Sequence, residues 1–252
     1  MMSKIRLIAR IDIKGENVIK GIQFDGLRKL GNPNEFAKKY YKDGIDEIFF
    51  MDAVASLYDR NGLYDIIDQA CKEVFIPITV GGGIRTIEDI KMALDAGADK
   101  VAINTQAIKN PEFIKKASRM FGRQCIVGSI ETKKRGEKWE AYIDNGREKT
   151  GKDVEEWAAE LEDLGVGEIM LTSVDRDGTQ QGFDIELIKS MCGKVTVPLI
   201  VSGGAGNLSH INDICKAACF DGLVIGSVLH YEKSDIFSIK NEMRQHNLRV
   251  RL

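Results

Sequence analysis

The chain has 252 residues, of which 43% are hydrophobic, and it carries a formal net charge of −2. This length suits one large α/β domain or two small ones, and the hydrophobic share is enough for a sizeable core. The near-neutral charge argues against nucleic acid or an anionic membrane as the main partner.

Eight short apolar segments alternate with helix-like segments along the chain. We expect strands at residues 5–12, 47–52, 76–81, 99–104, 124–130, 168–173, 197–203 and 221–227. These segments are apolar on both faces and rich in β-branched residues, as buried parallel strands are. Helices with recognisable ends lie between them, at residues 34–44, 86–98, 111–122 and 153–165. Eight such units predict an α/β fold, a (β/α)8 TIM barrel in a single domain over residues 1–252.

Two longer insertions interrupt this pattern at matching places in the two halves of the chain. The first runs from Lys14 to about Pro33, and we expect its stretch NVIKGIQF to form a β-hairpin. The second, residues 133–151, carries a hairpin turn at residues 144–146. Both lie at the face where barrel active sites form, which makes them candidate lids.

The sequence repeats itself at an offset of about half its length. PITVGGGIR is matched by PLIVSGGAG, ARIDIK by GSIETK, and DEIFFMDAVAS (residues 46–56) by GEIMLTSVDRD. An internal repeat of this kind predicts two half-barrels, at about residues 1–121 and 122–252.

Two acids occupy equivalent places in this repeat. Asp12 ends the first predicted strand and Glu131 ends the fifth. These strands are opposite each other in an eight-stranded barrel, so we expect the two carboxylates to face each other across its mouth. Such a pair divides general acid and general base roles if the surroundings push the two pKa values apart. The alternative is that each acid only caps a loop or pairs with Lys14 or Lys133.

Glycine-rich turns follow the third and seventh predicted strands, with GGG at residues 81–83 and SGG at residues 202–204. Glycine lets backbone N–H groups approach an anion closely, although it also serves tight turns for steric reasons alone. AINT and VIGS follow the fourth and eighth strands at a similar offset. These matching turns predict two phosphate-sized pockets and a substrate with a phosphate at each end.

Other polar residues lie near these turns. Asp177 and Gly178, in TSVDRDGT, are placed to hold a sugar hydroxyl or a phosphate, while Asp175 and Arg176 form a local ion pair in the simpler interpretation. Lys20, in the first insertion, either reaches a phosphate as a point charge or is merely solvated.

The five cysteines are Cys71, Cys125, Cys192, Cys215 and Cys219. Their odd number and the lack of a CxxC pair predict buried thiols rather than a disulfide framework, and therefore a reducing cytoplasm. Cys215 and Cys219 have a spacing that suits zinc, but no second ligand pair accompanies them, so we expect no metal and no other cofactor. No apolar run is long enough for a signal peptide or a membrane span.

Together these motifs closely resemble the cyclase subunit of imidazole glycerol phosphate synthase, the HisF family, over essentially the whole chain. The resemblance rests on RxxxRID, VIKGIQF, GLRKLGNP, VGGGIR, AGADKVAINT, WxxYxxNGR, LTSVDRDGT and SGGAG. It implies a (β/α)8 barrel that uses ammonia, delivered through the barrel from a HisH-type glutaminase subunit at the N-terminal face. The implied reaction, in histidine biosynthesis, converts a bis-phosphorylated ribulosyl aminoimidazole carboxamide nucleotide to imidazole glycerol phosphate and an aminoimidazole carboxamide ribonucleotide.

The resemblance also assigns site residues. Asp12 matches the family's catalytic strand-one aspartate, and Lys20 matches its hairpin lysine. The residues that match the first phosphate pocket are Gly83, Asn104 and Thr105, and those that match the second are Asp177, Gly178, Gly204, Gly226 and Ser227. The residues that match the family's ammonia gate, four alternating charges at the bottom of the barrel, are Arg6, Glu47, Lys100 and Glu168. Without the family, each of the four is an ordinary rim salt bridge of small worth.

Two departures from the family lie on the reacting face. The family's second catalytic acid is an aspartate in a stretch like AIDAK, whereas this chain has SIETK, with Glu131 in that place. Glutamate keeps the acidity but adds one methylene, about 1.5 Å of reach, and catalytic geometry tolerates errors of roughly 0.5 Å. On strand one, ARID replaces the usual PCLD.

These departures leave other functions open. A cyclase-like paralogue that channels ammonia with a glutaminase, for amidation of a surface-polysaccharide sugar, keeps the four charges but loses the cyclase reaction. The related phosphoribosyl isomerase shares the half-barrel repeat and a bis-phosphorylated substrate, yet it has no use for ammonia or the four charges. A non-enzymatic scaffold that only activates a glutaminase is a third alternative.

Overall fold

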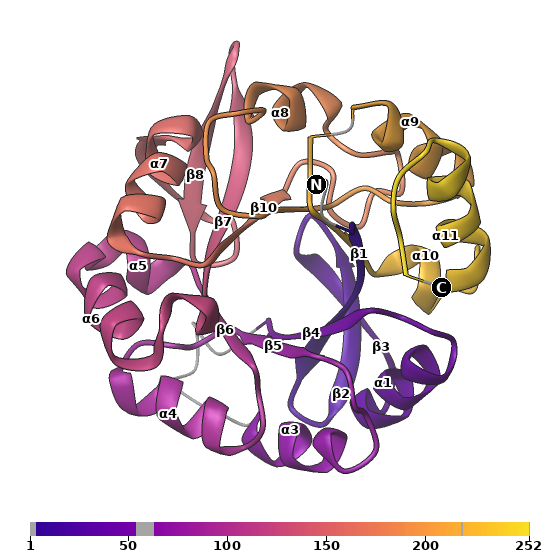
Figure 1. The fold of residues 1–252 in the computed structure, drawn as a ribbon, viewed down its shortest axis with the longest axis horizontal. Helices are drawn as coiled ribbons and strands as arrows, with labels where there is room; N and C mark the ends of the chain where they lie inside the picture. Colours follow the sequence, from indigo (N-terminus) through magenta and orange to yellow (C-terminus); the bar gives the residue numbers. More distant parts are fainter. Residues whose placement is uncertain (1–3, 54–62, 218, 252) are drawn as a thin grey trace.

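The computed structural model describes residues 4–53, 63–217 and 219–251. Eight parallel strands, each hydrogen-bonded to two parallel neighbours, close into a barrel (Figure 1). In order around the barrel they are β1 (Arg6–Lys14), β4 (Glu47–Asp52), β5 (Ile78–Gly81), β6 (Lys100–Ile103), β7 (Ile126–Arg135), β10 (Glu168–Ser173), β11 (Leu199–Ser202) and β12 (Gly222–Ile225). Pairing of β7 with β10 and of β12 with β1 closes the ring, which confirms the predicted (β/α)8 barrel.

Helices cover the outside of the barrel (Figure 1). Those in the described part of the chain are α1 (Pro33–Lys42), α3 (Tyr64–Cys71), α4 (Ile87–Asp95), α5 (Thr105–Lys109), α6 (Pro111–Phe121), α7 (Val154–Leu164), α8 (Ile185–Ser190), α9 (Leu208–Ala217), α10 (Ser227–His230), α11 (Ile236–Gln245) and the short 3₁₀ helix η1 (Arg123–Cys125). Local sequence sets their ends. Thr86 and Asp89 form a reciprocal capping box at the start of α4, and Gly165 ends α7 with a left-handed φ of 99°.

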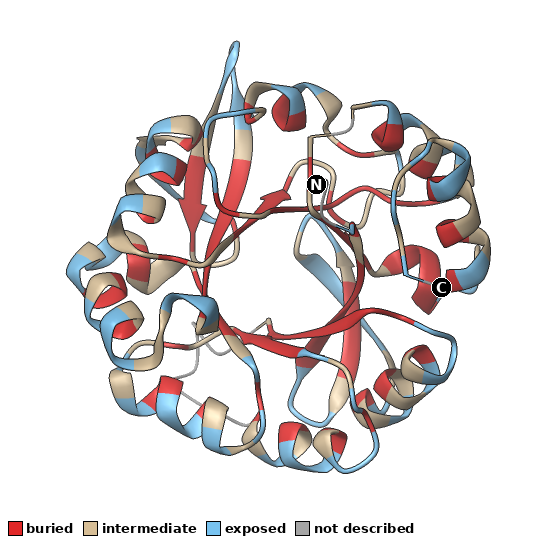
Figure 2. Cartoon of the chain, in the orientation of Figure 1, coloured by how far each residue is buried: buried red, intermediate tan, exposed pale blue. Residues whose placement is uncertain are grey.

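The barrel strands alternate their side chains between two cores. Leu7, Ala9 and Ile11 of β1 belong to the main core, between the strands and the helices. Ile8 belongs instead to a separate buried cluster inside the barrel, which we call the axial cluster. Its members are Ile8, Phe49, Met51, Ala102, Val127, Met170, Ile200 and Val224. Because both faces pack against apolar side chains, the barrel strands are buried along most of their length (Figure 2).

Both insertions form antiparallel strands beyond the carboxyl ends of the barrel strands, as predicted. They are β2 (Asn17–Ile22), β3 (Asp25–Gly31), β8 (Lys138–Ile143) and β9 (Glu148–Asp153). β2 pairs with β1, and β8 pairs with β7, so these two barrel strands continue beyond Asp12 and Glu131, where the sequence pattern ended them. Residues 144–146 have consecutive positive φ values of 50°, 57° and 69°, which confirms the predicted turn.

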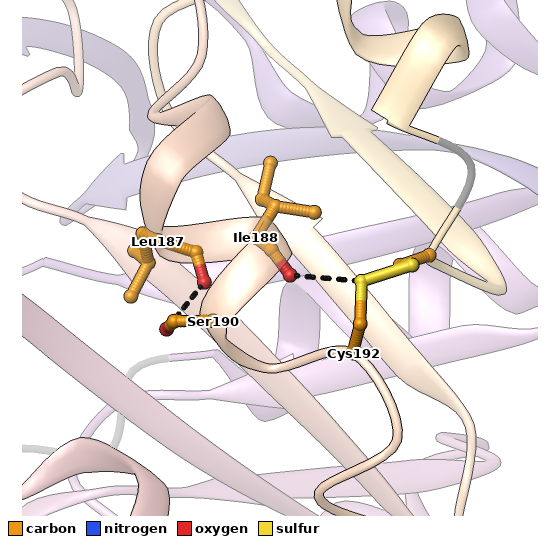
Figure 3. Close-up of a disulfide and its surroundings, with 5 residues drawn as sticks. Leu187, Ile188, Ser190 and Cys192 are labelled. Atoms are coloured by element: carbon orange, nitrogen blue, oxygen red, sulfur yellow. Dashed lines mark hydrogen bonds between the residues drawn. A yellow bond between two sulfur atoms is a disulfide. The ribbon is translucent and has the colours of Figure 1, made fainter.

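The expectation that the cysteines are thiols is wrong for one pair. Cys192, after α8, and Cys219, after α9, form a disulfide with a Cα–Cα distance of 5.5 Å (Figure 3). Their separation of 27 residues gives no local signal, because the two residues meet only through the fold. Cys71, Cys125 and Cys215 are free thiols.

Some predictions have no counterpart in the structure. The repeat segment DEIFFMDAVAS runs past residue 53, so its last residues lie outside the described part of the chain. The single domain over residues 1–252 and the two half-barrels stay predictions, because a closed barrel marks no boundary between its halves. Among the described helices, none is long and apolar enough to cross a membrane.

Replacing Cys192 with serine opens the disulfide and frees the unfolded chain of a constraint on a segment of 27 residues. Without reductant, we expect the free energy of unfolding to fall by about 2–4 kcal/mol. Denaturant unfolding of both proteins measures this difference, which should vanish when reductant is present. Equal stability without reductant would contradict the presence of the bond.

Candidate active site

Asp12 is the centre of a buried ion-pair network at the barrel mouth. Its Oδ1 accepts a hydrogen bond from Arg10 Nε at 2.7 Å, and its Oδ2 accepts one from Lys20 Nζ at 3.0 Å. Lys20 Nζ also donates to Asp177 Oδ1 at 3.1 Å. We call these four residues the mouth network. It joins β1, the first insertion and the loop after β10, and it brings together three residues that the sequence singled out separately.

Arg10 was not among the predicted site residues. It is two positions before Asp12 on β1, so strand alternation places both side chains on the interior face. Its exposed fraction is only 4%, and its guanidinium carbon lies 5.4 Å and 5.9 Å from the ring centres of Phe24 and Phe49. The one available signal was the departure of ARID from the family's PCLD, which puts an arginine where that motif has cysteine.

The mouth network fixes the charge of Asp12. Burial alone would raise the pKa of Asp12, but the adjacent Arg10 and Lys20 cations outweigh it and hold that pKa well below its usual range. Burial would likewise lower the pKa of Lys20, but the attraction of Asp12 and Asp177 raises it. Asp12 is therefore a carboxylate, and Lys20 an ammonium, throughout the neutral pH range.

Glu131 lies on β7, opposite β1 in the barrel order, and has the reverse electrostatics. Its exposed fraction is 6%, and its Oε2 accepts a hydrogen bond from the Gly146 backbone N–H at 2.8 Å. Burial raises the pKa of Glu131 to about 7, against smaller lowering effects of Arg10 and the Gly146 bond. The surroundings therefore push the pKa values of Asp12 and Glu131 in opposite directions.

The ion pairs considered above as simpler alternatives are not present in the described part of the chain. Asp12 pairs with its two cations rather than with Lys14. Lys133 lies 5.0 Å from the centre of an aromatic ring instead of pairing with Glu131. Asp175 accepts a hydrogen bond of 2.8 Å from a backbone N–H of β7.

A pocket of about 230 Å³ lies at the ends of β5, β6 and β7, and we call it the β6–β7 pocket. Its lining includes Gly82, Gly83, Asn104, Thr105, Ser129 and Glu131. Gly82 and Gly83 have φ values of 93° and 72°, in the region that favours glycine. Asn104 Nδ2 donates one of its two N–H groups to Tyr142 O at 3.1 Å. An anion in this pocket has backbone N–H groups and the Thr105 hydroxyl as donors.

A second pocket, of about 20 Å³, lies across the mouth at the ends of β11 and β12, and we call it the β11–β12 pocket. Arg10 and Lys20 line this pocket. So do all the residues that match the second phosphate pocket: Asp177, Gly178, Gly204, Gly226 and Ser227. A Cβ atom on Gly178 would lie 2.1 Å from Gly21 O, and one on Gly204 would lie 2.1 Å from Gly182 O. Both positions therefore require glycine, and the backbone of each turn is brought close to the pocket.

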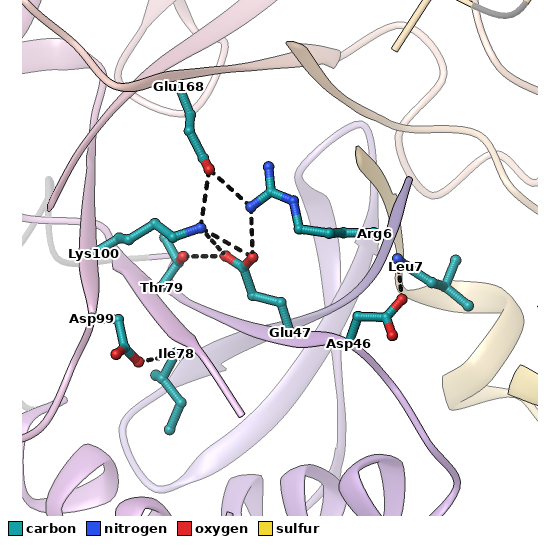
Figure 4. Close-up of polar contacts among 9 residues, drawn as sticks. All are labelled: Arg6, Leu7, Asp46, Glu47, Ile78, Thr79, Asp99, Lys100 and Glu168. Carbon is teal, nitrogen blue, oxygen red and sulfur yellow. Dashed lines mark hydrogen bonds and ion pairs between the residues drawn. The ribbon is translucent and has the colours of Figure 1, made fainter. Parts of the chain in front are cut away.

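Four charges close the opposite end of the barrel (Figure 4). Glu47 lies 3.0 Å from Arg6 Nη1 and 2.9 Å from Lys100 Nζ. Glu168 lies 2.9 Å from Arg6 Nη1 and 3.1 Å from Lys100 Nζ, so the side chains form a closed ring of alternating charge. We call it the charge ring. Thr79, which carried no signal in the sequence, adds a hydroxyl hydrogen bond of 2.6 Å to Glu47.

The zinc interpretation of Cys215 and Cys219 is wrong, because Cys219 is bonded to Cys192. Across residues 4–53, 63–217 and 219–251, no three His, Cys, Asp or Glu side chains are grouped in a way that would hold a metal ion.

Comparison with known proteins gives consistent matches. Residues 6–235 match the family model described as "Histidine biosynthesis protein". Over 212 residues, the chain is 55% identical to the imidazole glycerol phosphate synthase subunit HisF of Legionella pneumophila, which covers 84% of this chain and 100% of that protein. It is 43% identical to the HisF subunit of Methanococcus vannielii, with 100% of both chains covered. It is 42% identical to that of Methanopyrus kandleri, with 98% of this chain and 97% of that one covered.

The raised pKa of Glu131 makes a prediction about stability. The usual pKa of 4.5 rises to about 7 in the fold, so this group favours folding below pH 4.5 and loses that contribution as the pH rises through 7. Glu131→Gln stays neutral, so its stability relative to the wild type should increase by about 3 kcal/mol between acid and mildly alkaline pH. Denaturant unfolding at several pH values measures the difference. A difference that does not change with pH would contradict the assignment.

Proposed function

The chain belongs to the histidine biosynthesis protein family, among the HisF subunits of imidazole glycerol phosphate synthase, and we propose that the mouth of its barrel is the site of the cyclase reaction. The observation that carries this proposal is the pair of buried acids with opposite pKa shifts, Asp12 and Glu131, set between two glycine-lined pockets. Two titratable groups pushed apart in this way are suited to divide acid and base work.

The two acids take different roles in ammonia addition. Ammonia adds to the carbonyl carbon of the open-chain sugar, and the adduct then loses a proton from nitrogen and its hydroxyl group as water. Asp12 has no proton of its own at neutral pH and accepts the one from nitrogen, although Arg10 and Lys20 make it a weaker base than an ordinary carboxylate. Glu131, whose pKa of about 7 keeps a large share of it protonated at neutral pH, donates a proton to the departing hydroxyl.

The two pockets hold the two phosphates of the substrate. In the β6–β7 pocket, Gly83 and Thr105 supply backbone and hydroxyl donors. In the β11–β12 pocket, the Gly178, Gly204 and Gly226 turns bring the backbone close, and Lys20 adds a positive charge. Because the pockets lie on opposite sides of the mouth, a substrate bound in both is stretched across the two acids.

Ammonia reaches this site from the other end of the barrel. A subunit of a synthase has a partner, and we propose a HisH-type glutaminase docked against the N-terminal face. The charge ring of Arg6, Glu47, Lys100 and Glu168 lies at that face, and it acts as the gate that the ammonia passes. The axial cluster then gives a neutral molecule an apolar path to the mouth.

The sugar-amidating paralogue is less well supported than the cyclase, because the three relatives named above are all subunits of imidazole glycerol phosphate synthase. The isomerase is disfavoured by the charge ring, for which it has no use. We also place the enzyme in the cytoplasm, because a doubly phosphorylated nucleotide does not cross a membrane unaided and must be used where it is made.

Turnover of the bis-phosphorylated nucleotide with ammonium salt, measured on the chain alone, tests the cyclase proposal. We expect turnover by the wild type and a loss of roughly 10²–10⁴-fold in Asp12→Asn, because a general base is removed. Glu131→Asp measures the cost of the extra methylene. A wild type without turnover that Glu131→Asp restores would show that Glu131 does not support the reaction.

A second experiment tests the gate. In a complex with a HisH-type glutaminase, Lys100→Met removes one cation from the charge ring and should let ammonia escape, so that less product forms per glutamine hydrolysed. Ammonium-driven turnover should be unchanged. Lys240→Met is the control, since it removes a buried cation whose Nζ lies 2.7 Å from Asp46 outside the ring. Equal coupling in all three proteins would argue against a gate.

A further inference from the structure

Along the interior face of β7, the side chains change from apolar to polar to acidic toward the mouth. Val127, Ser129 and Glu131 alternate with outward-facing residues and so point into the barrel. Val127 belongs to the axial cluster, and Glu131 is the proposed acid. Ser129 therefore stands between the apolar interior and the catalytic carboxyl.

Ser129 has a buried hydroxyl with no hydrogen-bond partner among the described residues. Its exposed fraction is 2%, and the side chain lines the β6–β7 pocket with Glu131. A buried polar atom of this kind costs free energy unless something bonds to it. A ligand that occupies the barrel interior during turnover is the natural partner.

Two further acceptors without partners in the described chain lie on the neighbouring strands. Register pairs Ala102 of β6 with Val127, and two positions beyond Ala102 is Asn104, whose buried Oδ1 has no partner. On β10, Thr172 pairs with Glu131, and its buried Oγ1 also has no partner. We call Asn104, Ser129 and Thr172 the acceptor arc.

The acceptor arc lies immediately above the axial cluster. On each of its three strands, the residue two positions earlier is a member of that cluster: Ala102, Val127 and Met170. A small molecule that moves along the apolar interior from the charge ring therefore meets a layer of polar side chains next. Arg10 and Ser202, two positions beyond Ile8 and Ile200, belong to the same layer, and the acceptor arc is its part with unpartnered acceptors in the described chain. Their chemistry decides which molecule stops there.

The acceptor arc suits a neutral nitrogen donor. Asn104 Nδ2 donates one N–H to the Tyr142 carbonyl, and its Oδ1, which can only accept, has no partner in the described chain. The two hydroxyls can accept as well. Ammonia carries three N–H donors and no charge, which matches both the arc and the apolar path below it.

We propose that Ser129, with Asn104 and Thr172, forms a holding site for one ammonia molecule between the axial cluster and Glu131. The site deepens the proposed function, on which it rests. It also links two departures from AIDAK in the stretch SIETK, because Ser129 and Glu131 are neighbours on the interior face of β7. The amino groups of the nucleotide are the other nitrogen donors at hand, and the experiment separates the two sources.

Ser129→Ala removes the hydroxyl and leaves the packing of β7. In ammonium-driven turnover at one fixed alkaline pH, we expect its KM for ammonia to rise roughly three- to tenfold, the worth of one hydrogen bond. Thr172→Val should act in the same direction. The KM for the nucleotide should change less than the KM for ammonia, because the phosphate in the same pocket is held by Gly83 and Thr105.

Thr132→Val is the matched control. Thr132 is on the same strand, is fully buried and also has an unpartnered hydroxyl within the described chain, but it points away from the barrel interior. Its KM for ammonia should equal that of the wild type.

Three results would overturn the holding site. If the wild type is active and the KM for ammonia is unchanged in Ser129→Ala, the holding site is contradicted and the proposed function is not. A rise in the KM for the nucleotide instead assigns the hydroxyl to the nucleotide. A wild type with no ammonium-driven turnover removes the proposed function, and the holding site with it.

Discussion

The buried pairing of Asp12 with Arg10 and Lys20 is the interaction on which the barrel mouth depends. Each of these groups would be costly to bury alone, since an unpaired charge in a protein interior loses several kcal/mol of hydration. Together with Asp177 they balance two positive against two negative charges. The pairing also ties the first insertion to the barrel, because Lys20 comes from β2 and Asp177 from the loop after β10. The contacts that set the charge of Asp12 therefore also hold the first insertion against the barrel.

The same network explains why two acids at equivalent positions differ. Asp12 has two cations within hydrogen-bonding distance, whereas Glu131 has one backbone N–H and otherwise an interior that resists charge. The repeat supplies the twofold arrangement, and the unequal distribution of cations breaks it. Along the axis, the charge ring, the axial cluster, the acceptor arc and the two acids then form successive layers. These layers are in the order that the proposed passage of ammonia toward the mouth requires.

The sequence predicted the barrel and both insertions, because each leaves a local or repeated pattern, whereas the residues of the charge ring were assigned through the family resemblance. The alternation of apolar strands with helices is such a pattern, and so are the glycine turns, whose backbone angles few other residues adopt. Contacts between distant segments left none. The disulfide of Cys192 with Cys219 and the hydrogen bond of Thr79 to Glu47 join residues that meet only in the fold. Arg10 and Asp12 are two residues apart on β1, but their spacing alone did not indicate that they pair. The assignment of Asn104 to a phosphate pocket stays a prediction, and its bond to Tyr142 O was not foreseen.

The fold drives the pKa values of the two mouth acids, Asp12 and Glu131, apart. The most direct measurement is a titration of the side-chain carboxyl carbons by nuclear magnetic resonance, with Asp12→Asn and Glu131→Gln to assign the signals. We expect Glu131 to titrate near pH 7, while Asp12 stays ionised down to the pH at which the protein unfolds. Ordinary carboxyl values for both residues, near pH 4, would contradict it.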